Sequence, residues 1–136
     1  MKRRHLLAAT LAVGLPSAWA DQAELRAAIL AFTGGIEPQP GRVAIEIEPL
    51  IENGNAVPVM LSVDGVGIQR LALFSELNPL REVVQFEFGP GALPRASTRI
   101  RLATSQQLVA VARAADGRCW QASVEVLVTL AACIEG

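Results

Sequence analysis

The chain has 136 residues, a length that suits one domain with a single hydrophobic core. Apolar residues make up 51% of it, tyrosine is absent, and the formal net charge is −1 at neutral pH. The length excludes two independent domains, and the charge excludes the strongly basic surface that nucleic acid requires. We therefore expect one domain that binds neither nucleic acid nor an anionic membrane surface.

The first 20 residues have the layout of a bacterial signal peptide. Basic residues 2–4 precede an apolar run at 6–15, and Ala18-Trp19-Ala20 forms a cleavage site before Asp21. The run is shorter than the about 20 apolar residues that a transmembrane helix needs. The sequence thus predicts a signal peptide at residues 1–20 and a mature domain at residues 21–136, located in the periplasm without a membrane anchor.

The segment Arg3-Arg4-His5-Leu6-Leu7 also fits the core of a twin-arginine export signal. An ordinary secretory n-region that happens to contain two arginines fits as well, because such regions are commonly basic. If the twin-arginine interpretation holds, the protein crosses the membrane already folded. The sequence leaves both interpretations open.

Removal of residues 1–20 takes away the only histidine and the only lysine. The remaining chain has nine arginines against 13 acidic residues, a net charge of about −4. The loss of histidine and lysine excludes several kinds of site: those with an imidazole base, Schiff-base sites, P-loops and most zinc sites. We expect no metal site and no self-contained active site, although paired carboxylates among the ten glutamates remain possible.

The first element along the mature chain is predicted to be a short amphipathic helix. Leu25, Ile29 and Phe32 follow each other at helical spacing over residues 22–32, and Gly34-Gly35 ends the pattern.

Beyond this helix the apolar residues recur with period two, which is typical of half-buried strands. The alternation predicts strands near residues 43–48, 57–64, 84–88, 98–102, 108–114 and 120–130. Asn53-Gly54 and Asp116-Gly117 are turn signals, the former within a hairpin or meander, and Pro58 suggests an edge strand or a bulge. Short strands at close intervals predict an all-β sandwich with an N-terminal helix.

The two cysteines, Cys119 and Cys133, are predicted to be free thiols. If residues 120–130 form one continuous strand, the cysteines lie roughly 40 Å apart or more, at about 3.3 Å per residue. A disulfide requires Cα atoms within about 7 Å. Cys119 is interpreted as a small, partly buried residue at a strand end. Cys133 follows the last strand. An unpaired thiol at that place has a chemical function, is a leftover tail residue without one, or forms an intermolecular disulfide.

Several segments together resemble the SoxY family, the sulfur-carrier subunits of the SoxYZ complex of thiosulfate oxidation. The resemblance covers the mature chain almost end to end. The segments that carry it are Glu52-Asn53-Gly54-Asn55-Ala56-Val57-Pro58, Asn78-Pro79-Leu80, Ser97-Thr98-Arg99-Ile100-Arg101-Leu102, Asp116-Gly117 with Trp120, and Val128-Thr129-Leu130-Ala131-Ala132-Cys133.

The resemblance implies an immunoglobulin-like β-sandwich whose C-terminal arm carries sulfur on Cys133. The arm residues around it would be Ala131, Ala132, Ile134, Glu135 and Gly136. It also implies a heterodimer with a SoxZ-like subunit, and partner enzymes that include a c-type cytochrome and a hydrolase. The chain itself would be a carrier and not an enzyme, with a covalent sulfur adduct in place of a cofactor.

The arm departs from the best-known family pattern, Gly-Gly-Cys-Gly-Gly, because here it reads Ala-Ala-Cys-Ile-Glu-Gly at residues 131–136. Glycines allow positive φ and a thin backbone. Alanine and isoleucine stiffen the arm, and Glu135 places negative charge near a thiol that would carry sulfur oxyanions. The cargo, thiosulfate or another sulfur species, is therefore open.

Two rival hypotheses remain. The chain could be a periplasmic immunoglobulin-like binding or structural module whose tail thiol has no function. It could also be a redox enzyme that uses Cys133, which is disfavoured because no resolving cysteine is within reach and no base activates the thiol.

Overall fold

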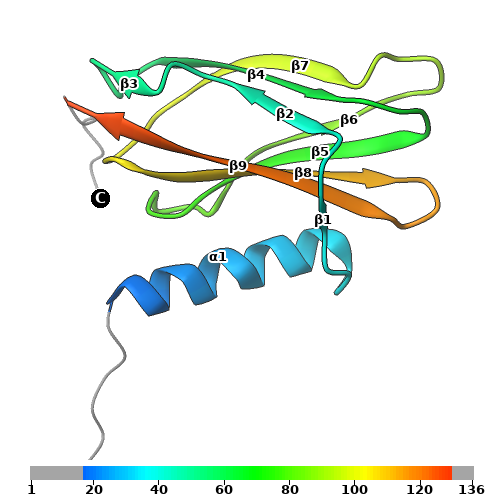
Figure 1. The fold of residues 1–136 in the computed structure, drawn as a ribbon, viewed down its shortest axis with the longest axis horizontal. Coiled ribbons are helices and arrows are strands. Elements are labelled where there is room, and N and C mark those ends of the chain that lie inside the picture. The colour runs from blue at the N-terminus through cyan, green and yellow to red at the C-terminus, as the bar shows by residue number, and fades with distance from the viewer. Residues whose placement is uncertain (1–16, 130–136) are drawn as a thin grey trace, which may run out of the picture.

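The computed structural model describes residues 17–129 and shows three layers: one helix, a six-stranded sheet and a three-stranded sheet (Figure 1). The elements are α1 (Ser17–Thr33), β1 (Gln39–Pro40), β2 (Val43–Glu46), β3 (Leu50–Ile51), β4 (Val57–Val63), β5 (Ile68–Ser75), β6 (Glu82–Glu87), β7 (Arg95–Ile100), β8 (Gln106–Ala114) and β9 (Cys119–Val128). We call the six-stranded sheet, of order β1-β9-β8-β5-β6 with β3 also paired to β9, the large sheet. The small sheet has the order β2-β4-β7. The predicted immunoglobulin-like β-sandwich with an N-terminal helix is confirmed.

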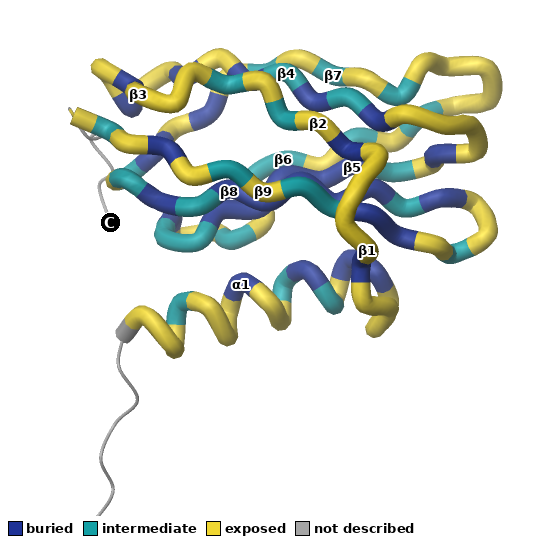
Figure 2. Tube along the Cα trace, viewed as in Figure 1, coloured by how far each residue is buried: buried dark blue, intermediate teal, exposed yellow. Residues whose placement is uncertain are grey.

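The core between the two sheets follows the alternation in the sequence. Every second residue of β4, from Val57 to Val63, is buried and faces the large sheet. Leu71 and Leu73 of β5 and Leu108 of β8 meet them from the other side and are fully buried. Figure 2 shows these buried positions along the facing sides of the sandwich.

The outer face of the large sheet is covered by α1 (Figures 1 and 2). Its apolar stripe forms a second core with the outward side chains of β5, β8 and β9. The members are Leu25, Ile29, Phe32, Ala72, Phe74, Val109, Val111 and Cys119. The rings of Phe32 and Phe74 meet edge to face with their centroids 5.8 Å apart.

Strand β5 has no counterpart among the predicted strands. It is buried on both faces, so apolar residues fill consecutive positions from Leu71 to Phe74 and period two disappears. Strand β8 has the same environment. Strand β8 was nevertheless predicted at residues 108–114, so burial on both faces hid β5 alone of these two strands.

The helix is longer than predicted, because it begins at Ser17 and not at residue 22. Its end agrees with the prediction. Gly34 and Gly35 follow with φ of 74° and 91°, and the Gly35 amide donates to the Leu30 carbonyl at 2.9 Å. No helix within residues 17–129 is long and apolar enough to span a membrane.

The prediction that Pro58 marks an edge strand or a bulge is wrong for the strand as a whole, since β4 is the middle strand of the small sheet. Strand β2, however, pairs only with Met60 to Val63 of β4. Pro58 lies beyond that pairing and opposes Arg99 of β7 on one side only. The missing amide of proline therefore costs no ladder hydrogen bond on the β2 side.

The predicted hairpin or meander around Asn53-Gly54 is also modified. Strands β2 and β4 are antiparallel neighbours, but the connection between them leaves the small sheet and forms β3, which pairs in parallel with the end of β9. The turn itself is present, with the Asn55 amide donating to Asn53 Oδ1 at 3.0 Å. This crossing opens a groove beside the first half of β4.

Replacement of Phe32 by alanine (Phe32→Ala) should lower the free energy of unfolding by about 3–5 kcal/mol, because it removes a buried ring from the helix–sheet interface. Arg26→Ala is the matched control on the exposed side of α1, where the Arg26–Glu37 pair is more than half exposed. That change should cost at most about 1 kcal/mol. Urea unfolding measures both, and equal losses would show that the helix does not depend on this interface.

Candidate functional site at the base of the C-terminal arm

The residues predicted to carry sulfur lie outside the described part of the chain. Cys133 and its neighbours Ala131, Ala132, Ile134, Glu135 and Gly136 all follow Thr129, the last described residue. The structure therefore defines the base from which the arm leaves and the surface that surrounds this base.

The last residues of β9 are held from both sides. On one side β3 pairs in parallel, with the Leu127 amide donating to the Pro49 carbonyl and the Thr129 amide to the Ile51 carbonyl, each at 2.9 Å. On the other side the Val128 amide donates to Ser105 Oγ at 2.7 Å. Hydrogen bonds on both edges keep the strand in register up to Thr129.

The Thr129 side chain adds a further link, since its Oγ1 lies 3.3 Å from the Ile51 carbonyl oxygen and 3.4 Å from that of Glu52. Cys133 follows four residues later in the sequence. An extended chain advances at most about 3.6 Å per residue, so a segment of four residues spans at most about 14 Å.

Asn78 connects the loops that surround the base. Its Nδ2 donates to the Arg101 carbonyl at 2.7 Å, and its Oδ1 accepts from the Ala103 amide at 3.0 Å and from Gln106 Nε2 at 2.9 Å. Gln106 Oε1 in turn accepts from the Leu77 amide at 2.9 Å. The loop that carries Ser105 is thereby fixed to the β5–β6 loop.

Arg81 extends this network to the helix. Its Nη1 donates to the carbonyls of Glu76 and Asn78 at 2.7 and 2.8 Å, and its Nη2 bonds Asp21 at 3.0 Å and Glu24 at 3.1 Å. The Arg81 side chain is only 15% exposed, so these contacts are partly shielded from solvent. A continuous set of polar contacts thus runs from the start of α1 through two loops to the base of the arm.

Most of the segments that carry the family resemblance gather at this end of the sandwich. The Leu102 amide donates to the Gly54 carbonyl at 2.8 Å, which joins two of them, and Asn78 joins a third. Asp116-Gly117 lies instead in the β8–β9 turn at the other end, next to Trp120. There the guanidinium groups of Arg42 and Arg118 lie 4.6 and 5.1 Å from the centre of the Trp120 ring.

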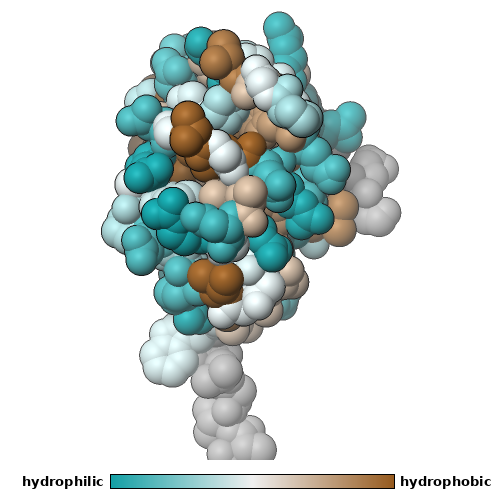
Figure 3. Space-filling view, turned by 90° about the vertical axis from the view of Figure 1, so that its right-hand side faces the viewer, coloured by the Kyte–Doolittle hydropathy of each residue, from teal (hydrophilic) through white to brown (hydrophobic). Residues whose placement is uncertain are grey.

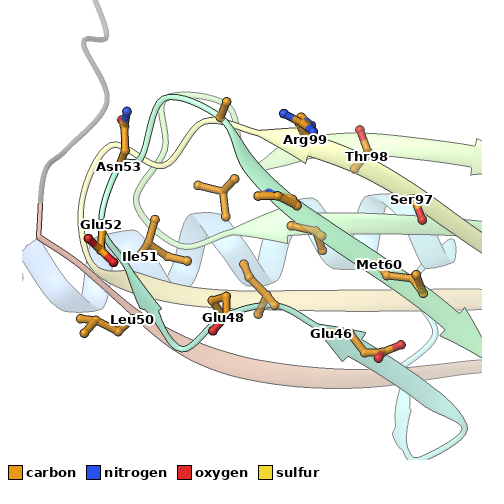
Figure 4. A pocket seen from close by; sticks show the side chains of 15 residues that line it. Glu46, Glu48, Leu50, Ile51, Glu52, Asn53, Met60, Ser97, Thr98 and Arg99 are labelled. Carbon is orange, nitrogen blue, oxygen red and sulfur yellow. The ribbon is translucent and has the colours of Figure 1, made fainter.

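A groove of about 1130 Å³ opens next to the anchor, between residues 46–53 and the strands β4 and β7 (Figure 4). Glu46, Glu48 and Glu52 line one side of it, and Arg99 lies on the other (Figure 4). The charged side chains that line the groove are therefore mainly acidic. Within residues 17–129 no cluster of three or more potential metal ligands is found.

Exposed leucines accompany the anchor. Leu50 and Leu127 oppose each other in the β3–β9 pairing and are 55% and 62% exposed. Leu80, in the β5–β6 loop, is also exposed. At the opposite end of the sandwich, seen in Figure 3, the hydrophobic groups stand apart from one another on a largely hydrophilic surface.

Cys119 is a free thiol in a different environment. It lies buried under α1, where the interpretation as a small residue at a strand end is confirmed, although it is more deeply buried than predicted. Burial raises the pKa of the Cys119 thiol above its ordinary value of 9.0, while the positive charge of Arg113 opposes the shift. A neutral, enclosed thiol is a poor nucleophile.

Sequence analysis did not assign a role to the residues that build the base. Asn78 and Thr129 entered only as part of the resemblance, and Ser105 not at all. Their partners lie 23 to 78 positions away in the sequence, so neither periodicity nor local spacing could have indicated the contacts.

The raised pKa of Cys119 implies a loss of stability at alkaline pH. Its contribution is complete below the unfolded-state pKa and disappears as the pH rises through the folded-state value. We expect the free energy of unfolding to fall above about pH 9 in the Cys133→Ser background, and to fall less in Cys119→Ala/Cys133→Ser. Tyrosine is absent and Lys2 is the only lysine, so few other groups titrate there. Parallel pH profiles for the two variants would contradict the expectation.

Comparison with solved structures supports the fold and indicates a family. The sulfur carrier protein SoxY from Chlorobium limicola f thiosulfatophilum is 31% identical and superposes with a TM-score of 0.70, over 80% of this chain and 99% of that one. A superoxide reductase (neelaredoxin) from Ignicoccus hospitalis is 21% identical, with a TM-score of 0.54 over 65% of this chain and 80% of that one. A putative superoxide reductase from Thermotoga maritima is 19% identical, with a TM-score of 0.55 over 71% and 89% of the two chains.

At these identities the superoxide reductases share the fold alone with this chain. A comparison with curated proteins finds no match. The family model described as sulfur oxidation protein SoxY matches residues 29–133, a span that starts within α1 and ends on Cys133. The chain therefore belongs to the SoxY family of sulfur carriers.

Proposed function

We propose that this chain is a periplasmic carrier that holds sulfur intermediates covalently on Cys133 during the oxidation of thiosulfate or a related sulfur compound. The observation that carries the proposal is the match to the SoxY family, which extends to Cys133. The anchor at Thr129 supports it, because a strand held on both edges gives a short arm a fixed origin.

In the proposed cycle Cys133 is first joined to thiosulfate. A sulfur–sulfur bond forms between the thiol and the outer sulfur of thiosulfate, one proton leaves, and two electrons pass to a c-type cytochrome enzyme. A hydrolase then adds water across the bond to the sulfonate group, which releases sulfate and a proton and leaves a persulfide on Cys133. The carrier holds the sulfur throughout, and its partners perform the reactions.

The composition of the chain supports a carrier that depends on such partners. After residue 20 no histidine, lysine or tyrosine remains to act as a general base or a covalent catalyst. Cys119 is enclosed under α1 and is not placed for sulfur transfer. The reactive chemistry then rests on one thiol that partner enzymes reach from outside.

The cargo is the part of the proposal that the arm sequence affects most. Glu135 lies two residues from Cys133, and the groove beside the anchor carries three glutamates against one arginine. A sulfonate adduct carries a fixed negative charge and would meet repulsion there, whereas the charge of a persulfide depends on its protonation, so a persulfide would meet less repulsion. The mass of the adduct distinguishes the two cargoes.

The proposed location rests on the first 20 residues, with a mature chain that starts at Asp21. Asp21 would then remain available to bind Arg81. The intact mass of the exported protein tests this start. Export of an Arg3→Lys/Arg4→Lys variant distinguishes the two pathways, because only the twin-arginine route requires the arginine pair.

Cys133→Ser should abolish sulfur carrying and leave the melting temperature unchanged within the small effect of a surface substitution. Intact-mass spectra of protein from thiosulfate-grown cells should show an adduct on the wild type that a thiol reductant removes. The adduct should be absent from Cys133→Ser.

Cys119→Ser is the matched control for this experiment, since it removes the other thiol. It should cost measurable stability because Cys119 packs in the second core, and it should keep the adduct. An adduct on Cys119, or full thiosulfate-dependent activity in Cys133→Ser, would overturn the assignment.

A SoxZ-like subunit is the proposed partner, and the exposed leucines around the anchor are the proposed contact. Leu50→Ser/Leu127→Ser should reduce co-purification with that subunit at least tenfold. Val66→Ser, which changes an exposed residue in the β4–β5 turn, is the control and should have no effect. Equal co-purification of both variants would place the contact elsewhere.

A further inference from the structure

The predicted cleavage point between Ala20 and Asp21 lies inside a helix. Helix α1 begins at Ser17 and continues to Thr33, so the residues on both sides of the cleavage point are helical. The side chains around it are accessible, since Trp19 is 64% exposed and its neighbours on either side are exposed as well. Access to this peptide bond is therefore limited by the backbone and not by side chains that cover it.

The helical backbone occupies both polar groups of the peptide bond. In an α-helix each amide donates to the carbonyl four residues earlier, so the Ala20 carbonyl accepts from the Glu24 amide. The Asp21 amide, on the other side of the same bond, donates to the Ser17 carbonyl. A peptidase must stabilise the developing oxyanion with donors of its own, so it needs this carbonyl oxygen free. Cleavage therefore requires residues 17–24 to unwind, and we call these residues the N-terminal turns.

The N-terminal turns are held mainly by polar contacts. Leu25 is the first buried residue among the described side chains of α1, and residues 18–24 are exposed or half-buried (Figure 2). Arg81, in the loop between β5 and β6, bonds Asp21 at 3.0 Å and Glu24 at 3.1 Å. Unwinding therefore breaks the two ion pairs of Arg81 and exposes no buried apolar side chain.

Arg81 is the main one of these contacts. The other, from Gln22 Nε2 to Glu76 Oε2, is 3.4 Å long and exposed. The Arg81 side chain is only 15% exposed, and its Nη1 is fixed by the carbonyls of Glu76 and Asn78 at 2.7 and 2.8 Å. Because the planar guanidinium is already oriented by the loop, little conformational freedom is lost when Nη2 binds the helix.

We propose that Arg81 controls the proteolytic processing of the folded precursor. While its guanidinium holds Asp21 and Glu24, the cleavage point stays helical, and a peptidase cuts only the fraction of molecules whose N-terminal turns have opened. This inference rests on the proposed export and its cleavage point. It concerns the precursor after folding, which is the form that crosses the membrane if the twin-arginine interpretation holds.

The residues after the cleavage point are suited to form a new helix start. The first turn of the uncut helix contains no acidic residue. The cut helix begins with Asp21-Gln22-Ala23-Glu24, an acidic capping residue followed by a glutamate three positions later. Negative side chains at this end complement the helix dipole and offset the charge of the new terminal ammonium. The cut end can therefore bind Arg81 again, so processing shortens α1 without releasing it from the sheet.

Cleavage kinetics test the proposal. The full chain with residues 1–20 attached is treated with a bacterial leader peptidase in detergent, and intact mass follows the loss of these residues. The folded chain should be cut about tenfold or more slowly than a synthetic peptide of residues 10–28, because its bond is accessible only after opening. Arg81→Gln removes both ion pairs and should be cut about fivefold or more faster than the wild type.

Two further variants separate this role from other effects of the substitution. Glu24→Gln removes one ion pair and leaves Arg81 with its loop contacts, so it should accelerate cleavage of the full chain about twofold. In the peptide, which lacks Arg81, the same substitution should leave the rate unchanged. Arg26→Gln, at an exposed position farther along α1, is the matched control and should be cut at the wild-type rate.

Hydrogen exchange, followed by NMR, measures the opening without a peptidase. The amides of residues 21–24 should exchange about fivefold or more faster in Arg81→Gln than in the wild type. Those of residues 29–33 should stay protected, because Leu25, Ile29 and Phe32 remain packed on the large sheet. If Arg81→Gln loosens residues 29–33 as well, Glu24→Gln decides the question, because it leaves the loop contacts intact.

Equal exchange of residues 21–24 in the wild type and both variants, or both variants cut at the wild-type rate, would overturn the proposal. A folded wild-type chain cut as fast as the peptide would also overturn it. Cleavage at a different bond would refute the proposed start of the mature chain and the role of Arg81 with it. Unchanged kinetics at the Ala20–Asp21 bond would refute the role of Arg81 alone, and sulfur carrying on Cys133 is independent of all these readouts.

Discussion

Strands β5 and β8 have no solvent face, because the small sheet covers one side of them and α1 covers the other. Burial of apolar surface, at roughly 25 cal/mol per Å², is the main favourable term in folding. These two strands bury apolar side chains on both faces. The helix is therefore part of the fold and not an appendage. Its position also decides the state of Cys119, whose thiol is enclosed because α1 lies over it.

The helix and the base of the arm are joined by polar contacts at one end of the sandwich. Arg81 ties Asp21 and Glu24 to the β5–β6 loop, Asn78 ties that loop to residues 101–106, and Ser105 ties these residues to Val128. Each link is a hydrogen bond or ion pair made by the side chain of a residue in a loop, and several of these bonds satisfy backbone groups that have no sheet partner. The end of the domain from which the arm leaves is consequently ordered by side chains, whereas the opposite end consists of short turns rich in glycine.

The two thiols illustrate how one domain can separate packing from chemistry. Cys119 is neutral and buried, which protects it from oxidation and from transfer reactions. Cys133 follows an anchor that is held on both edges, which in the proposed function limits the volume that a bound sulfur can explore. The acidic groove and the exposed leucines lie beside this anchor, and in the proposed function they are the surface that partner proteins contact.

The sequence by itself determined the strands with one wet face, the turn at Asp116-Gly117 and the C-terminal end of the helix, because each depends on local sequence patterns. It also determined the free state of Cys119, because the length of the last strand separates the two cysteines. It also identified the family and, through it, the candidate residue Cys133. Only the tertiary structure revealed β5, whose burial on both faces removes the alternation that a strand normally shows. Only the tertiary structure placed Pro58 in a central strand. A proline is tolerated there because β2 stops short of it. The anchor at Thr129 was likewise decided by tertiary structure, since β3, Ser105 and β9 are distant in sequence and meet only when the chain crosses from one sheet to the other.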